Sequence, residues 1–320
     1  MIPLGIREFC QADLEALTAL INRADQVDHT GFATSAEDLA HDLVEPGAGR
    51  TKSVLLAESG DALIGYTLLH KATGDTPRLM AVGAVDPDWR RRGVGTALML
   101  RAEERAAELV DQRPVPLDLP LHDSVAGARE LAQSLAYQPV RQFLYMVCAD
   151  ALSVPAPIFP AHIALRDYVQ GQDEEEFAAA YGEIFADHWG EEPYTLADEQ
   201  HRSRAPSFQP EDNLLAIDAK DGMAGFCLLD PQAAGAAGPT LARIDDLGVR
   251  PAYRGQGIGR ALLLAGMKRL GDRGATSVGL FVDAASPYPA VHLYESLGFV
   301  TQDRVTIFRK EIGAPDQARD

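Results

Sequence analysis

The sequence is poor in cysteine, in basic residues and in long apolar runs, and each shortage excludes a class of protein. Its 320 residues include three cysteines, Cys10, Cys148 and Cys227, with no Cys-x-x-Cys spacing. An odd, unpaired set excludes a disulfide framework and fits a reducing cytosol. Lys and Arg number 29 against 47 Asp and Glu, a net charge of −18. That balance argues against nucleic-acid partners and against an anionic membrane surface.

Apolar segments are also short. The longest runs, such as Ala261–Met267, fall far below a membrane span, and Met1–Cys10 lacks the pattern of a signal peptide. The eight histidines have no metal-ligand spacing with Cys, Asp or Glu, so no metal is expected. A hydrophobic content of 46% is typical of a globular chain. We therefore expect a soluble cytoplasmic protein without a metal.

A proline-rich stretch near the midpoint separates two similar halves. Three prolines within 152–161 predict a stiff, extended connector. The predicted organisation is an N-terminal domain at 1–150, a linker at 151–161 and a C-terminal domain at 162–320. Each half has the pattern of a strand, two helices, a hairpin and a third strand, so the fold class is α/β or α+β.

The two halves are copies of one unit. Segments 85–98 and 249–262 match when shifted by 164 positions, and the short segments 133–137 and 295–299 also resemble each other. A match in register at this distance indicates an internal duplication. The positions identical between the longer segments are Val85/Val249, Pro87/Pro251, Arg90/Arg254, Gly93/Gly257, Gly95/Gly259, Ala97/Ala261 and Leu98/Leu262.

A glycine loop follows the third strand of each half. In the second half it reads Arg-x-x-Gly-x-Gly and opens a predicted helix at 258–271. Glycines let the backbone approach a ligand, and the unpaired amides and dipole of a helix start favour a diphosphate. A dinucleotide fingerprint would need glycine where Arg260 and Leu98 stand, and neither loop has the lysine of a P-loop.

This loop, repeated after a strand and a proline and followed by Leu-Tyr-Glu-Ser-Leu-Gly-Phe at 293–299, resembles the GCN5-related N-acetyltransferase (GNAT) family in tandem. The resemblance implies that each domain is a mixed, mostly antiparallel sheet flanked by helices, with acetyl-CoA as co-substrate. In the second half it implies coenzyme contacts from Leu247, Gly248, Val249, Arg254, Gly255, Gln256, Gly257, Ile258, Gly259, Arg260 and Ser286. In the first half it implies contacts from Val85, Arg90, Arg91, Arg92, Gly93, Val94 and Gly95.

The same resemblance suggests catalytic groups in the second half. Acetyl transfer to an amine needs a base, donors for the thioester oxygen and an acid for the departing thiolate. We expect Asp245 as the base, through water, with Asp246 as the second choice. Adjacent strand residues point to opposite faces, so only one of the two is expected to point into a given cleft. Tyr294 stands where the family often has its general acid, and the amides of Leu247 and Val249 would bind the thioester and pantetheine.

Some positions depart from the family pattern. Arg243 stands where histone-type relatives and mycothiol synthase have their catalytic glutamate, so neither mechanism carries over directly. Ser286 stands where an asparagine is common. The first half has Ala81, Val82 and Ala132 in place of the two acids and the tyrosine. We expect that half to be degenerate, either binding acetyl-CoA without turnover or serving as a structural partner.

The predicted function is transfer of acetyl from acetyl-CoA to a primary amine. Segment 188–194 combines Trp189 and Tyr194 with Glu191 and Glu192, which suits a cationic amine but also an acidic helix terminus with a hydrophobic staple. A mycothiol synthase-like acetyltransferase of an amino-sugar/cysteine conjugate and a non-catalytic acyl-CoA-binding protein are the alternatives. The expected partner is a small-molecule amine, and the expected state is a monomer or homodimer.

Overall fold

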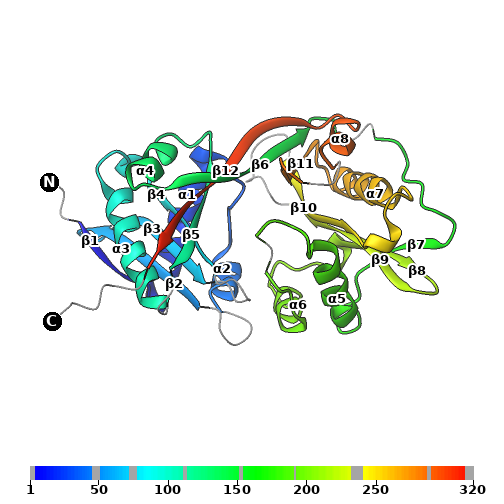
Figure 1. The fold of residues 1–320 in the computed structure, drawn as a ribbon, viewed down its shortest axis with the longest axis horizontal. Coiled ribbons are helices and arrows are strands. Elements are labelled where there is room, and N and C mark those ends of the chain that lie inside the picture. Colours follow the sequence, from blue (N-terminus) through cyan, green and yellow to red (C-terminus); the bar gives the residue numbers. More distant parts are fainter. Residues whose placement is uncertain are drawn as a thin grey trace. The chain divides into compact units, whose positions relative to one another are not determined.

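The computed structural model describes residues 4–44, 51–71, 78–110, 114–150, 154–190, 192–231, 241–286 and 290–313. They belong to two compact units. Unit 1 comprises Met1–Gln142 with Arg304–Asp320, and unit 2 comprises Phe143–Asp303. Figure 1 shows the order of their helices and strands along the chain. None of the described helices has the length and apolar content that crossing a membrane requires.

Unit 1 is a sheet in the order β1-β2-β3-β4-β5-β12. Neighbouring strands pair antiparallel except β4 and β5, which are parallel. The elements of this unit are β1 (Gly5–Glu8), α1 (Leu14–Asp28), α2 (Ala36–Asp42), β2 (Thr51–Ser59), β3 (Ala62–Lys71), β4 (Leu79–Val85), α3 (Val94–Leu109), β5 (Val115–His122), α4 (Ala128–Ser134) and the greater part of β12 (Val300–Ile312).

Unit 2 repeats this plan in the order β7-β8-β9-β10-β11-β6. Here β10 and β11 form the parallel pair. The elements are the second part of β6 (Gln138–Cys148), β7 (Ile163–Asp167), α5 (Glu174–Phe185), α6 (Leu196–Arg202), β8 (Asn213–Asp218), β9 (Gly222–Asp230), β10 (Leu241–Val249), α7 (Ile258–Asp272), β11 (Ser277–Asp283) and α8 (Ala290–Glu295).

Each unit takes the last strand of its sheet from the other half of the sequence. In unit 1, β12 pairs with β5 from Val305↔His122 to Ile312↔Val115. In unit 2, β6 pairs with β11 from Val278↔Cys148 to Asp283↔Phe143. The predicted domain organisation, with a linker at 151–161, does not include this exchange of strands.

Helices cover both faces of the sheet in each unit. In unit 2, Phe226 and Leu228 of β9 pack in one buried cluster with α5, whereas Cys227 and Leu229 pack in another with α7. Because alternate residues of a strand point to opposite faces, α5 and α7 lie on opposite sides of the sheet (Figure 1). Unit 1 has the same layers, with α3 on one face and α1 and α2 on the other. The expected class, two tandem domains with mixed sheets flanked by helices, is confirmed.

Candidate active site

The glycine loop of unit 2 connects β10 to α7. A short 3-10 turn at Pro251–Tyr253 follows the strand, and Gly257 is the N-cap of α7. Gly255 and Gly257 have φ values of 75° and 83°, where a side chain would be strained. No described atom lies within 4 Å of the position that a Cβ would take at either residue. The loop therefore offers an open backbone surface and the unpaired amides of a helix start, which suits a diphosphate.

Most of the side chains predicted to contact the coenzyme instead stabilise the conformation of the loop. Arg254 donates from Nε to the carbonyl of Val249 and from Nη2 to that of Ile184, both at 3.1 Å. It thereby fastens the loop to β10 and to the end of α5. Gln256 and Arg260 are exposed, and Arg260 donates to Ser296 Oγ at 3.0 Å. Ser286 closes a turn by donating its backbone N–H to Asp283, at 3.1 Å.

The equivalent loop of unit 1 has the same backbone but different charges around it. Gly93 is the N-cap of α3 with φ of 85°, and Arg91 takes a left-handed φ of 60° where unit 2 has a glycine. Arg90 donates from Nη1 and Nη2 to both carboxylate oxygens of Asp28, at 2.8 and 2.7 Å. Arg92 lies over the ring of Trp89, 5.2 Å from its centroid. The charge of Arg90 is thus neutralised within the protein.

A β-bulge in β10 marks the candidate catalytic position. The pairing with β9 runs from Ile244↔Leu229 directly to Asp246↔Leu228, so Asp245 is the additional residue. The parallel pairing of β10 with β11 runs from Leu241 to Ile244. The strands therefore diverge where the bulge begins, and the backbone of 245–249 loses its pairing with β11. In unit 1 the equivalent strand β4 pairs with β3 without a register shift.

The bulge brings both aspartates to one side of the sheet. Arg243 donates from Nε to Asp245 Oδ1 at 2.5 Å and from Nη2 to Asp230 Oδ2 at 3.2 Å. Asp246 accepts a hydrogen bond from Tyr181 of α5, and both aspartates interact with Arg202 of α6. The bulge interrupts the alternation behind the expectation that only one aspartate points into a given cleft, and that expectation stays a prediction.

The two carboxyl groups have different electrostatic surroundings. Desolvation and the charge of Asp245 raise the pKa of Asp246 to about 6, although Arg202, Arg243 and the Tyr181 hydroxyl act in the opposite direction. Desolvation also raises the pKa of Asp245, although 40% of its side chain is exposed, and Arg243 opposes that shift directly. Asp246 therefore has the environment of a base that titrates near neutral pH.

Tyr294 lies on α8 and packs in the buried cluster on the α7 side of the sheet. It is 8% exposed, and burial together with nearby Cys227 and Asp246 raises the pKa of its hydroxyl. A tyrosine in this state keeps its proton at neutral pH and can act as a donor. Cys227 is fully buried and burial raises the pKa of its thiol, as expected of an apolar core residue.

Tyr181, which hydrogen-bonds Asp246, belongs to a group of packed aromatic side chains. Tyr181 stacks on Tyr194 with ring centroids 4.2 Å apart, and Trp189 lies 6.3 Å from Phe143 of β6. The hydroxyl of Tyr194 donates to the buried carboxylate of Glu199 at 2.8 Å. Tyr194 is therefore packed against neighbouring side chains. Glu191 lies outside the described residues.

Several of these residues were missed by sequence reasoning. Tyr181, Glu199 and Arg202 lie on helices, and nothing in their spacing distinguishes them from ordinary amphipathic positions. Phe143 reaches unit 2 only because the last strands are exchanged. Contact across the fold, and no local signal, brings Tyr181 and Arg202 into the surroundings of the aspartates.

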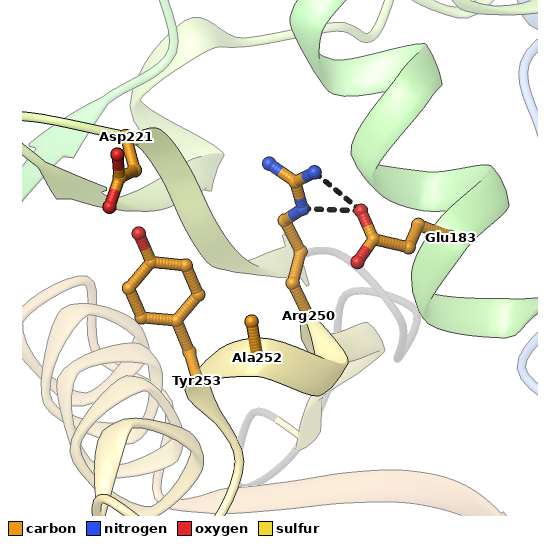
Figure 2. A pocket seen from close by; sticks show the side chains of 5 residues that line it. All are labelled: Glu183, Asp221, Arg250, Ala252 and Tyr253. Atoms are coloured by element: carbon orange, nitrogen blue, oxygen red, sulfur yellow. Dashed lines mark hydrogen bonds and ion pairs between the residues drawn. The ribbon is translucent and has the colours of Figure 1, made fainter.

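Two cavities are found among the described residues of unit 2. One, of about 350 Å³, is lined by Glu183, Asp221, Arg250, Ala252 and Tyr253 (Figure 2). Its arginine is paired with Glu183 at 2.5 Å, so its charge is already compensated. The other, of about 450 Å³, includes Cys148, Arg260 and Ser296. Neither contains the two aspartates or Tyr294. The described residues contain no group of three or more His, Cys, Asp or Glu side chains able to hold a metal.

The chain belongs to the acetyltransferase (GNAT) family, whose model matches residues 17–120 and 175–299. One match falls in each half, so the chain is an acyltransferase of tandem GNAT architecture.

The chain is similar to particular members of this class over almost its whole length. A mycothiol acetyltransferase of Parafrankia sp. is 33% identical over 314 residues, which cover 92% of this chain and 94% of the relative. A GCN5-related N-acetyltransferase from Sphaerobacter thermophilus has a TM-score of 0.70 at 29% identity and covers 98% of both chains. A tandem GNAT protein from the clavulanic acid biosynthesis pathway has a TM-score of 0.76 at 18% identity, with 98% of this chain and 100% of that chain covered. At that identity it supports the fold alone.

Proposed function

We propose that unit 2 transfers the acetyl group of acetyl-CoA directly to a primary amine. The observation that carries this proposal is the placement of Asp246 at the point where β10 and β11 diverge, on the strand that leads into the open loop before α7. A candidate base on β10, a loop before α7 that suits a diphosphate and a candidate acid on α8 thus occur in one unit.

Each group has a defined task in this reaction. The carboxylate of Asp246 takes a proton from the ammonium of the acceptor, directly or through water. The neutral amine forms a bond to the thioester carbonyl carbon, and the backbone amides of Leu247 and Val249 stabilise the negative charge on its oxygen. The carbon–sulfur bond then breaks, Tyr294 gives its proton to the departing thiolate, and the nitrogen of the new amide returns a proton to the Tyr294 oxygen. Asp246 replaces Asp245 as the preferred base because Arg243 engages Asp245 in an ion pair.

The acceptor is proposed to be a small amine that carries positive charge. Asp230 and Asp245 both bond Arg243, Asp246 lies next to Asp245 on the strand, and Tyr181 hydrogen-bonds Asp246. Carboxylates and aromatic faces are both favourable to ammonium groups. The three cysteines are free in the structure, which supports a reducing cytosol as the site of action.

A second candidate acceptor is a cysteine conjugate of an amino sugar. It is favoured by 33% identity to a mycothiol acetyltransferase over almost the whole chain. Arg243 counts against a shared mechanism, because mycothiol synthase is expected to have its catalytic glutamate at that position.

The test is an assay of free thiol released from acetyl-CoA in the presence of spermidine, glucosamine or a cysteinyl amino-sugar conjugate. Calorimetry of acetyl-CoA binding accompanies it. Saturable binding together with thiol release that depends on one amine supports the proposal. Absence of binding contradicts it, and binding without release for any primary amine contradicts the proposed acceptor class.

A further inference from the structure

Arg243 lies at the centre of a small cluster of acids in unit 2. Its side chain is 15% exposed, and its cross-strand partner in the register of β10 and β9 is Asp230. It bonds Asp230 at 3.2 Å and Asp245, two residues along its own strand, at 2.5 Å. One guanidinium therefore connects two carboxylates that flank the bulge.

The other cation near the aspartates is already engaged. Arg202 donates from Nε and Nη2 to Glu199, at 2.9 and 2.8 Å, and from Nη1 to Asn213 at 2.6 Å. Its guanidinium also lies 4.8 Å from the ring centroid of Phe177. Arg202 can influence the aspartates only at a distance, whereas Arg243 is in direct contact with one of them.

The bulge creates an electrostatic problem that Arg243 addresses. It brings Asp245 and Asp246 to one face, where two adjacent carboxylates repel each other. A cation fixed on Asp245 alone makes the two groups unequal, because one carboxylate is compensated and the other is not.

We propose that Arg243 is a positioning residue that keeps Asp245 ionised and in place, so that Asp246 is the member of the pair that exchanges protons. This inference rests on the proposed function and adds a division of labour to it. Asp245 then acts as a fixed negative charge that makes its neighbour a stronger base, without touching the acceptor's proton.

Groups on five elements act on Asp246 and enter its titration. They are Asp245 and Arg243 on β10, Tyr181 on α5 and Arg202 on α6, together with Cys227 on β9 and Tyr294 on α8, which act electrostatically from the α7 side of the sheet. Cys227 and Tyr294 are neutral near pH 6, because burial raises the pKa of each. The charges that change the proton affinity of Asp246 are therefore those of Asp245, Arg243 and Arg202.

The experiment is a carboxyl NMR titration of the full chain labelled with ¹³C-aspartate, with the Asp246 signal assigned by its loss in Asp246→Asn. Asp245→Asn removes a neighbouring negative charge and should lower the pKa of Asp246 by about one unit. Arg243→Gln removes a positive charge and should raise it by about one unit. The double variant should return close to the wild-type value. Arg243→Lys keeps the charge and should stay within about half a unit.

The outcomes separate this inference from the proposed function. Shifts of opposite sign in the two single variants support the role of Arg243, even if no amine is acetylated. The inference is overturned if the pKa of Asp246 is the same in the wild type, Asp245→Asn and Arg243→Lys, and if Arg243→Gln either has that same pKa or does not fold. Loss of acetyl transfer in Asp246→Asn combined with unchanged titration in the other variants would leave the base assignment intact and refute the positioning role alone.

Discussion

The proposed acid–base chemistry depends most on the carboxyl group of Asp246. Asp246→Asn keeps the shape of the side chain but cannot accept a proton, so kcat/KM should fall by about 10²- to 10⁴-fold. Acetyl-CoA affinity, measured by calorimetry, should stay within about twofold. Asp272→Asn on α7, where the acid forms only an exposed pair with Lys268, is the matched control and should keep full activity.

The pH profile provides a second test of the same residue. A general base works in its deprotonated form, and the pKa of Asp246 is raised to about 6. In the wild-type protein kcat/KM should therefore decrease as the pH falls through about 6 and stay level above it, until another group titrates. A profile that is flat between pH 5 and 7 in steady-state kinetics would exclude Asp246 as the base.

The hydroxyl of Tyr294 is predicted to protonate the leaving thiolate. Tyr294→Phe should lower kcat by about 10- to 100-fold and leave acetyl-CoA binding unchanged, because the ring still packs on Phe299. Tyr137→Phe is the control, since Tyr137 is also buried but lies in unit 1, away from the proposed chemistry. Equal rates in Tyr294→Phe and Tyr137→Phe would assign Tyr294 to packing.

At the scale of elements, the two glycine loops differ in the charges that surround one shared arginine. Both arginines donate from Nε to the last carbonyl of the preceding strand, but Arg254 also bonds the carbonyl of Ile184 on α5, whereas Arg90 forms a two-point ion pair with Asp28. Arg254→Ala should therefore weaken acetyl-CoA binding at the catalytic site by about tenfold or more, through loss of loop shape and positive charge. Arg90→Ala should leave the KM for acetyl-CoA unchanged. Similar increases in KM for both variants would show that the two loops contribute equally.

The conformation of these loops could be predicted from the sequence, but the bulge in the strand beside them could not. Arg-x-x-Gly-x-Gly dictates a left-handed residue and a helix start locally, and the structure has both at Gly93 and Gly257. The bulge at Asp245 depends on how β10 pairs with β9 and separates from β11, which no local pattern encodes. For the same reason the grouping of Asp230, Arg243 and Asp245 could not be predicted from their spacing.

At the scale of the whole molecule, the exchanged last strands could not be anticipated either. The segments that became β6 and β12 follow equivalent helices in the two halves, and each is an ordinary strand by pattern. Pairing within one half or with the other half satisfies the same backbone hydrogen bonds, so local sequence does not distinguish the two. The duplication nevertheless predicted two sheets of equal plan, because both halves carry the same order of strands and helices.

The exchange makes the end of the chain part of unit 1. Asp118 of β5 is fully buried and accepts two hydrogen bonds from Arg309 of β12, at 2.6 and 2.7 Å. Arg309→Met leaves that carboxylate without its main partner and should lower the free energy of unfolding by about 2–4 kcal/mol, somewhat less than for a fully buried pair because Arg309 is partly exposed. Lys268→Met, which breaks an exposed pair on α7, should cost less than about 0.5 kcal/mol.

Hydrogen exchange can show which strands the Arg309→Met substitution destabilises. In Arg309→Met the amides of β5 and of 305–312 should exchange faster, since those two strands bond each other through the residues on either side of Asp118. The amides of β10 around Asp246 belong to unit 2 and should keep their protection, and kcat below the unfolding transition should remain close to that of the wild type. Faster exchange confined to β10 and α8 would mean that the last strand supports the catalytic half instead, and would contradict the assignment of its end to unit 1.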